Sequence, residues 1–424
     1  MKINSWKRFI GSLCSQLTHA LFFISMATGL AGTVYAQVSV TKSEFHGRES
    51  YSLQNSSMRI SVLTGGSYIA ELTLISSSGR EMVNPMFIPH YSTIDPHNYN
   101  LESHQDLYGT GRNAKLMAGY MGHYLCFPYF GGSVTSAEEE LGYSTHGEAY
   151  TVKYEVAERM EEDAAVISAT AELPLTKYAV SRSFTLLPGQ SVVLVEEEIQ
   201  NLENFDRPYH WVQHVTFGKP FIEYGKTKVD APVTKIAFSA KKDDPSNRNS
   251  VQWPNVSTES GETINSGIFS SDKGEGGYRA WLMDPEREYT WFTMYHTELD
   301  LLVGYIFSKD ENPWIGDWQE NQRSQVMPRS GKTVAWGLEV GTTPFGGGVS
   351  SIEREPVFGT KTFRLIGAKE KKKQSYLIFL MEIEDGFQGV KHLKFEKGAI
   401  MLEEKHSGRQ MVVTHGFGSS PLSK

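Results

Sequence analysis

Apolar and polar residues alternate in short runs along most of the chain. Clear examples are residues 59–63, 166–171, 191–195 and 291–295, which are rich in β-branched or aromatic residues. A two-residue period is typical of half-buried antiparallel strands, and the Gly, Pro, Asn and Asp between the runs are typical of turns. No segment after Ala36 has a sustained helical period. The pattern predicts an all-β sandwich of antiparallel strands with few or no helices.

The first 36 residues have the pattern of a secretory signal peptide. Basic residues occur within the first eight positions, residues 20–34 are apolar and uncharged, and small residues precede Gln37. We expect cleavage after Ala36, a periplasmic or secreted protein, and no stable membrane anchor after cleavage. An uncleaved anchor helix is the alternative, because the stretch before Ala20 is long.

Residues 37–424 are expected to form a single β-sandwich domain that includes C-terminal strands within 375–415. Cleavage would leave Cys126 as the only cysteine, so an exported chain would depend on its hydrophobic core rather than on internal disulfides. Two stretches, residues 109–149 and 241–261, lack a clear period. Loops of that length in a compact β-domain are often functional, so we expect them to contribute to a site.

Charge and motifs exclude several classes of function. The chain has 41 Lys and Arg against 49 Asp and Glu, a formal net charge of −8, so no broad basic surface is available for nucleic acid. The 13 His residues occur in no zinc-binding motif, and no nucleophile elbow is present. We therefore expect no metal and no cofactor.

The remaining candidate chemistry lies in short segments where His, Glu or Trp has apolar neighbours. A histidine in such a strand is often only a hydrogen-bonded core residue. A glutamate between Leu338 and Val340 is harder to explain, because a buried carboxylate without a partner is costly. The segments are Gly122–Pro128 with His123, Thr145–Ala149 with His146, Trp211–Gly218 with His214, Trp314–Asn321 with Trp318, Glu320 and Asn321, and Trp336–Thr342 with Glu339.

The order of these segments resembles the galactose mutarotase-like (aldose 1-epimerase) superfamily, whose members are β-supersandwiches that bind a sugar in a cleft on one sheet. The segment with His123 stands where the family has an arginine-containing motif. His146-Gly147 is similar to the family's His-Gly-Gly motif, His214 to its later His motif, and Leu338-Glu339 to its late Leu-Glu strand. The resemblance covers most of the chain from about Val40 and is nearest to an uncharacterised, exported branch of the superfamily.

The resemblance implies an isomerase that interconverts sugar anomers. This reaction removes the proton of the C1 hydroxyl and protonates the ring oxygen, so that the ring opens, rotates and closes on the other face. It calls for an acid and a base on opposite sides of one pyranose. By resemblance, Glu339 is the base and His214 the acid.

The other site residues also follow from the resemblance. His146 would hydrogen-bond the ring or a hydroxyl, and His123 stands where a substrate-orienting arginine is expected. Trp318 would stack on the sugar, with core packing as its alternative role, while Glu320 and Asn321 would bind hydroxyls. Asp317 is the nearest candidate for the family's sugar-binding aspartate.

A different class of function stays open. A catalytically silent, exported carbohydrate-binding protein would keep the sandwich and the cleft without turnover. The presence of His214 and Glu339 favours the enzyme, and the missing arginine favours the binding protein. In both cases the expected partner is a monosaccharide or an oligosaccharide.

Overall fold

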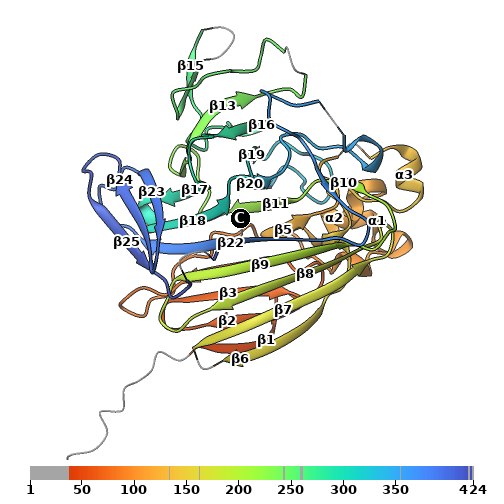
Figure 1. Ribbon diagram of the computed structural model, residues 1–424, viewed down its shortest axis with the longest axis horizontal. Coiled ribbons are helices and arrows are strands. Elements are labelled where there is room, and N and C mark those ends of the chain that lie inside the picture. The colour runs from red at the N-terminus through yellow and green to blue at the C-terminus, as the bar shows by residue number, and fades with distance from the viewer. Residues whose placement is uncertain are drawn as a thin grey trace, which may run out of the picture. The chain divides into compact units, whose positions relative to one another are not determined.

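The computed structural model describes residues 38–132, 134–161, 163–241, 244–257, 261–353, 355–418 and 421–422. The predicted signal peptide, residues 1–36, lies outside the described residues. The elements of the described part are strands for the most part, with a few short helices (Figure 1).

The larger sheet has ten antiparallel strands. Its centre is formed by strands from distant parts of the sequence, because β5 pairs with β11 and β11 pairs with β20. The strand order is β1 (Ser39–Phe45), β2 (Arg48–Gln54), β3 (Met58–Leu63), β4 (Ile69–Leu74), β5 (His123–Cys126), β11 (Val212–Gly218), β20 (Val334–Gly341), β19 (Trp314–Asn321), β16 (Glu275–Met283) and β13 (Val233–Ala237).

The second sheet has eight antiparallel strands. Along β8, buried and partly exposed residues alternate strictly from Tyr178 to Leu186, as the sequence pattern predicts for a strand with one face in the core. The order is β12 (Lys228–Asp230), β17 (Tyr289–His296), β18 (Leu301–Ser308), β22 (Lys371–Glu382), β9 (Val192–Asn201), β8 (Tyr178–Leu186), β7 (Ala164–Leu173) and β6 (Glu155–Glu161).

One large hydrophobic core joins the two sheets. It contains side chains from both, such as Ile60 and Trp336 from the larger sheet and Phe184 and Ile378 from the second. This is the packing of a β-sandwich, in which the inner faces of two sheets interdigitate. The expected all-β sandwich is therefore confirmed, and the four example runs lie in β3, β7, β9 and β17.

Smaller sheets complete the described part. The C-terminal strands β23 (Val390–Glu396), β24 (Ala399–Glu404) and β25 (Gln410–Thr414) form a sheet of their own. A separate apolar cluster packs this sheet against β18 and β22. Two further pairs are β10 (Arg207–Tyr209) with β21 (Arg364–Ile366), and β14 (Asn255–Ser257) with β15 (Thr263–Asn265).

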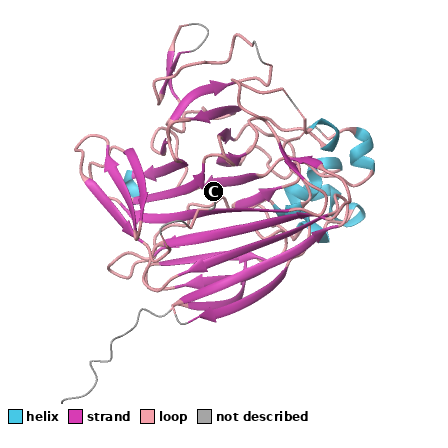
Figure 2. Cartoon of the chain, viewed as in Figure 1, coloured by secondary structure: helices cyan, strands magenta, loops and turns pink. Residues whose placement is uncertain are grey.

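Three short α-helices lie together at one end of the sheets (Figure 2). The capping box between Thr135 and Glu138 explains where the third begins, because each side chain satisfies a backbone N–H of the other. The helices are α1 (Leu101–Tyr108), α2 (Ala114–Gly119) and α3 (Ser136–Glu140), and the 3₁₀ turns are η1 (Pro96–Asn98), η2 (Gly111–Asn113), η3 (Ala149–Thr151), η4 (Thr297–Leu299) and η5 (Val349–Ser351).

Candidate active site

Neighbouring strands of the ten-stranded sheet carry the candidate residues. Because side chains alternate between the two faces of a strand, a core residue places its neighbours on the opposite face. On β11, Val215 packs in the core between the sheets, so His214 lies on the other face. On β20, Leu338 packs in the same core, so Glu339 lies on that other face too. We call this side of the sheet the cleft face.

His214 and Glu339 are directly opposite each other on paired strands. Nε2 of His214 lies 2.8 Å from Oε1 of Glu339, and each side chain is 4% exposed. From the sequence, an acid and a base are expected on opposite sides of one sugar. The structure corrects this: the two groups lie side by side in direct contact, because the register of β11 and β20 pairs them.

The second oxygen of the Glu339 carboxylate is buried and has no hydrogen-bond partner among the described residues. Gly316 on β19 faces Glu339 across the strand pair. A Cβ atom at Gly316 would lie 2.9 Å from Oε2 of Glu339, so the glycine keeps the space in front of the carboxylate open. A buried acceptor without a partner is unfavourable, which fits an atom that meets a hydroxyl when a ligand binds.

The imidazole of His214 is fixed on its other sides. Its Nδ1 lies 3.0 Å from the hydroxyl of Thr216, which lies 3.0 Å from the hydroxyl of Tyr120. Tyr124, opposite on β5, stacks on the ring at a centroid distance of 4.5 Å and an interplanar angle of 17°. These contacts hold the ring in one orientation toward Glu339.

His146 lies beside this pair, with its ring 5.2 Å from that of His214. The backbone N–H of Gly131 donates to its Nδ1, which leaves the ring proton on Nε2. Burial lowers the pKa of His146 well below the usual histidine value, so the ring is neutral at pH 7. The following residue, Gly147, has φ of 90°, and a Cβ atom there would lie 2.3 Å from the carbonyl oxygen of Phe127. The His-Gly pair thus requires glycine at its second position.

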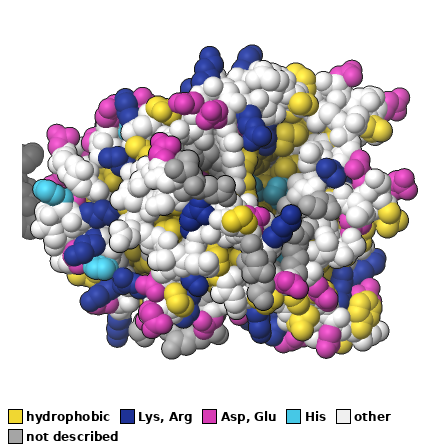
Figure 3. All heavy atoms as spheres, turned by 90° about the horizontal axis from the view of Figure 1, so that it is seen from above, with side chains coloured by type: hydrophobic (Ala, Val, Ile, Leu, Met, Phe, Trp, Pro, Cys, Tyr) yellow, Lys and Arg dark blue, Asp and Glu magenta, His cyan; other side chains and the backbone are white. Residues whose placement is uncertain are grey.

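A cavity of about 900 Å³ lies over the cleft face and includes His146, His214 and Glu339 in its lining. Seen from above, a hollow on the molecule has hydrophobic side chains on its walls and histidine within it (Figure 3). Most of the remaining lining is aromatic or apolar, as in many small-molecule sites. It comprises Tyr108, Leu116, Met117, Tyr120, Tyr124, Phe130, Tyr278, Trp318, Val326, Met327, Arg329 and Phe345, with short polar or small residues between them.

The expected functional role of the stretch 109–149 agrees with this geometry. Twelve lining residues fall between Gly109 and His146. The stretch forms α2, β5 and α3 rather than a plain loop. From the second stretch, 241–261, no described residue lines the cavity, although Ala240 directly before it does.

Trp318 lies on the cleft face and lines the cavity. Glu320 and Asn321 do not line the cavity. Oε1 of Glu320 accepts hydrogen bonds from the backbone N–H groups of Arg323 and Ser324, at 2.6 and 3.0 Å. The Asn321 amide donates to the backbone of another loop. The structure does not support the expectation that Glu320 and Asn321 bind sugar hydroxyls, because neither lines the cavity, one oxygen of Glu320 holds the turn that follows β19, and the Asn321 amide holds the loop of Ser271.

His123 is also not a cleft residue. Tyr124 occupies the cleft face of β5, so its neighbour His123 points into the space between the two sheets. There its Nε2 lies 2.9 Å from the side-chain oxygen of Gln213, and its ring packs against Tyr305 of β18. Burial lowers the pKa of His123 well below its usual value. The structure corrects the assignment of His123 as a substrate-orienting residue: it is a hydrogen-bonded core histidine.

Asp317, the weak candidate for a sugar-binding aspartate, faces the core as well. Its carboxylate accepts hydrogen bonds from Nε of Arg279 at 2.5 Å and from the indole of Trp336 at 2.7 Å. Both partners lie on neighbouring strands. Asp317 therefore links β16, β19 and β20 and does not reach the cavity.

Sequence reasoning missed several residues that form the cavity. Strand alternation offers Tyr124 as the alternative to its neighbour His123, and the pairing of β5 with β11 places it directly opposite His214. Tyr120 and Tyr278 have no comparable signal, because their place depends on which distant segments meet. Arg329 lies in the turn region after β19, where no pattern marks it.

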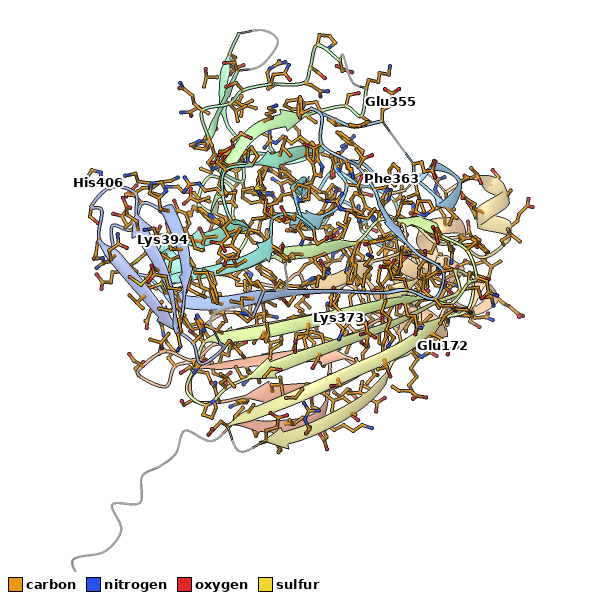
Figure 4. The ribbon with its side chains drawn as sticks, in the orientation of Figure 1. Glu172, Glu355, Phe363, Lys373, Lys394 and His406 are labelled. Atoms are coloured by element: carbon orange, nitrogen blue, oxygen red, sulfur yellow. The ribbon has the colours of Figure 1, made fainter. Side chains whose placement is uncertain are left out.

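No cluster of His, Cys, Asp and Glu in the described part of the chain has the geometry to hold a metal ion. No helix among the described residues is long and apolar enough to cross a membrane. Charged residues such as Glu172 of β7 and Lys373 of β22 are exposed, away from the cavity lining (Figure 4).

Comparison with solved structures identifies the fold. The chain superimposes on a candidate aldose 1-epimerase from Klebsiella pneumoniae with a TM-score of 0.59 and 15% sequence identity, covering 82% of this chain and 83% of that one. It is similar to a galactose mutarotase-like protein from Clostridium acetobutylicum, with a TM-score of 0.56, 11% identity and coverage of 82% and 99%. A candidate mutarotase from Salmonella typhimurium gives a TM-score of 0.52, 10% identity and coverage of 82% and 97%.

The fold is galactose mutarotase-like. Nothing among the protein-family models or the curated proteins matches the sequence. At 10 to 15% identity the structural likeness establishes the fold and not the activity. The function is therefore inferred from the cavity and from the His214–Glu339 pair.

Proposed function

We propose that this protein is an aldose 1-epimerase that interconverts the anomers of a sugar by acid–base ring opening. The observation that carries the proposal is the His214–Glu339 pair on the floor of an aromatic cavity, with one carboxylate oxygen buried and unpartnered. Resemblance to mutarotases in fold supports the same conclusion without deciding it.

The proton transfers follow from the positions of the two groups. Oε2 of Glu339 takes the proton of the C1 hydroxyl, and the imidazolium of His214 gives its Nε2 proton to the ring oxygen. The C1–O5 bond breaks as the carbonyl forms. After rotation about the C1–C2 bond, the reverse transfers close the ring on the other face and regenerate both groups.

The contact between the two groups is compatible with this chemistry. The C1 hydroxyl and the ring oxygen are bonded to the same carbon atom, so the acid and the base that serve them must lie close together. Before the transfer, Oε1 of Glu339 accepts a hydrogen bond from Nε2–H of the imidazolium, and Nδ1–H donates to the Thr216 hydroxyl. The fixed orientation of the His214 ring keeps its Nε2 proton near the Glu339 carboxylate until a bound sugar breaks this contact.

Aromatic side chains would hold the sugar. Trp318 and Tyr120 offer ring faces beside His214, at centroid distances of 6.3 and 5.9 Å. A pyranose stacks on such faces while its hydroxyls meet polar groups. His146 would donate its Nε2–H to a hydroxyl or to the ring oxygen. A single pyranose occupies roughly 200 Å³ at organic-solid packing density. A cavity of about 900 Å³ therefore has room for a monosaccharide or for the end of an oligosaccharide.

A carbohydrate-binding protein without turnover is the second candidate. One observation favours it: both ring nitrogens of His214 have partners within the chain, so the acid has no free nitrogen. Catalysis then requires a sugar to displace one of these contacts, whereas binding alone does not.

Polarimetry of freshly dissolved α-anomers tests the proposal. Glucose, galactose, xylose and rhamnose should be followed with and without the protein, and the approach to equilibrium should accelerate for at least one of them. Binding without acceleration, seen for the same sugars by calorimetry, would support the binding protein. Neither acceleration nor binding would contradict both candidates.

We also propose that the chain is exported. The support is the pattern of the first 36 residues, with a basic start, an apolar run and small residues before Gln37. An exported enzyme of this kind would act on sugars outside the cytoplasm.

A further inference from the structure

Arg329 is the only lysine or arginine among the described residues that line the cavity. Its guanidinium carbon lies 5.1 Å from the ring centroid of Trp318 and 5.8 Å from that of Tyr120. Its side chain is 19% exposed. A cation is thus held over two aromatic rings of the cavity.

One hydrogen-bond donor of this guanidinium is unused. Its Nε is buried and has no partner among the described residues. Its ion-pair partner there is Glu320, but the closest approach, from Nη1 to Oε2, is 3.7 Å, which is too long for a hydrogen bond. The other oxygen of Glu320 is occupied by two backbone N–H groups. A buried N–H without a partner is unfavourable, so the Nε–H group of Arg329 calls for an acceptor.

The chemistry of the missing acceptor follows from the side chain. Guanidinium has a planar fork of N–H donors that fits a carboxylate or a phosphate in a bidentate pair. The contacts of the guanidinium with the rings of Trp318 and Tyr120 use none of its N–H groups. Glu320 and Glu339 place two carboxylates in the neighbourhood of the site, which disfavours a doubly charged phosphate more than a singly charged carboxylate. The surroundings therefore favour a carboxylate.

The place of Arg329 relative to His214 defines where that carboxylate sits on the ligand. Tyr120 and Trp318, the rings beneath the guanidinium, are also the rings beside His214. In a hexuronic acid the carboxylate is carried by the carbon next to the ring oxygen. A ring oxygen placed at His214 therefore puts this carboxylate within a few ångströms of the His214 ring, beside Tyr120 and Trp318, the two rings that Arg329 also contacts.

We propose that the cavity selects a uronic acid, with Arg329 as the specificity-determining residue that binds its carboxylate. The proposal rests on the proposed function for the position of the ring oxygen. It names the substrate class of the same site: a sugar with a carboxylate at C6, alone or at the end of a chain.

Calorimetric titration of the full chain provides the test, with D-galacturonate and D-glucuronate compared against D-galactose and D-glucose at pH 7. We expect at least one uronate to bind about tenfold or more tightly than its neutral counterpart, the scale of one hydrogen bond to a charged group. Arg329→Gln should abolish this preference, so that the uronate and its neutral counterpart bind with similar affinity. Arg329→Lys, which keeps the charge and loses the fork, should retain only part of it.

Arg323→Gln is the matched control, because Arg323 lies in the same turn region but does not line the cavity. It should leave the preference unchanged, and thermal melts should show that all variants fold. Equal binding of neutral and acidic sugars, or a preference that survives Arg329→Gln, would overturn the proposal. Tighter binding of galactose 6-phosphate than of galacturonate would overturn it in favour of a phosphosugar.

These results separate the two proposals. Acceleration of mutarotation for neutral sugars without any preference for uronates would support the epimerase proposal and contradict the uronate proposal. A preference for uronates that depends on Arg329, without turnover of any sugar, would support the uronate proposal and contradict the epimerase proposal.

Discussion

The imidazole of His214 and the carboxylate of Glu339 meet through Nε2 and Oε1 at 2.8 Å, on neighbouring strands that pair these two residues directly. The other carboxylate oxygen faces no partner among the described residues. One contact thus holds the pair together, and one atom remains for a ligand. The predictions below test this arrangement and the fold that produces it.

Gly316→Ala tests whether the space in front of Glu339 matters. The new methyl carbon would lie 2.5 Å from the Tyr278 hydroxyl and 2.9 Å from Oε2 of Glu339. Displacement of the carboxylate should lower kcat/KM by about a hundredfold, the effect of misplacing a catalytic group by about 1 Å. Gly277→Ala on β16 is the control, because no atom lies within 4 Å of its added carbon. Equal activity of the two variants would show that the space is not used.

Trp318 is expected to stack on the sugar. Trp318→Ala should weaken binding by about 1 to 3 kcal/mol, the scale of losing one aromatic contact in a buried site. Trp318→Phe keeps a ring face and should bind more nearly like the original protein. Titration with the best ligand should change tryptophan fluorescence in the original protein but not in Trp318→Phe. Unchanged binding by Trp318→Ala would make this residue a packing residue of the cavity wall.

Glu404 should make the C-terminal sheet sensitive to acid. Burial opposes its ionisation, but hydrogen bonds from Ser407, His406 and Gln388 outweigh this and lower its pKa to about 2. Because this pKa is lower in the folded than in the unfolded chain, the stabilisation is complete above the ordinary carboxylate range and is lost as the pH falls toward 2.

Denaturant unfolding at several pH values measures this contribution. Glu404→Gln should lower the free energy of unfolding by about 1.5 to 3 kcal/mol at pH 7, the scale of hydrogen bonds to a charged group. The loss should shrink as the pH is lowered. Glu396→Gln on β23, at an exposed position, should have little effect on the free energy of unfolding at any of these pH values. A loss that is independent of pH would assign Glu404 a packing role.

Export predicts a specific mature N-terminus. Mass spectrometry of the native protein should find Gln37 as the first residue, as glutamine or in its cyclised form. Ala36→Arg should block processing, because the peptidase requires a small residue there. Native protein that begins at Met1 would contradict cleavage.

Strand alternation alone predicts much of the fold and part of the site. The two-residue period predicts strands of both sheets such as β3, β7, β9 and β17, and strand alternation places His214 and Glu339 on the opposite face from the core residues Val215 and Leu338. Their contact could not be predicted in this way, because it depends on the register between strands that lie far apart in the sequence.

The errors in the predicted site have the same origin. His123 and Tyr124 are neighbours, and a difference of one position decides which of them faces the cleft. Glu320 lies near the end of β19, where the backbone of the next turn competes for its carboxylate. Arg329 was missed because a turn has no periodic pattern, so that only the folded chain brings it over Trp318.

The central claim is that His214 and Glu339 act together as acid and base. The most direct measurement is the rate of anomer exchange, by polarimetry or by NMR, for Glu339→Gln, His214→Asn and the double variant, with ligand affinity measured in parallel. Each single change should lower kcat by at least about a hundredfold and leave affinity within a few-fold, and the double variant should be little worse than either. Near-normal exchange by folded Glu339→Gln would contradict the account.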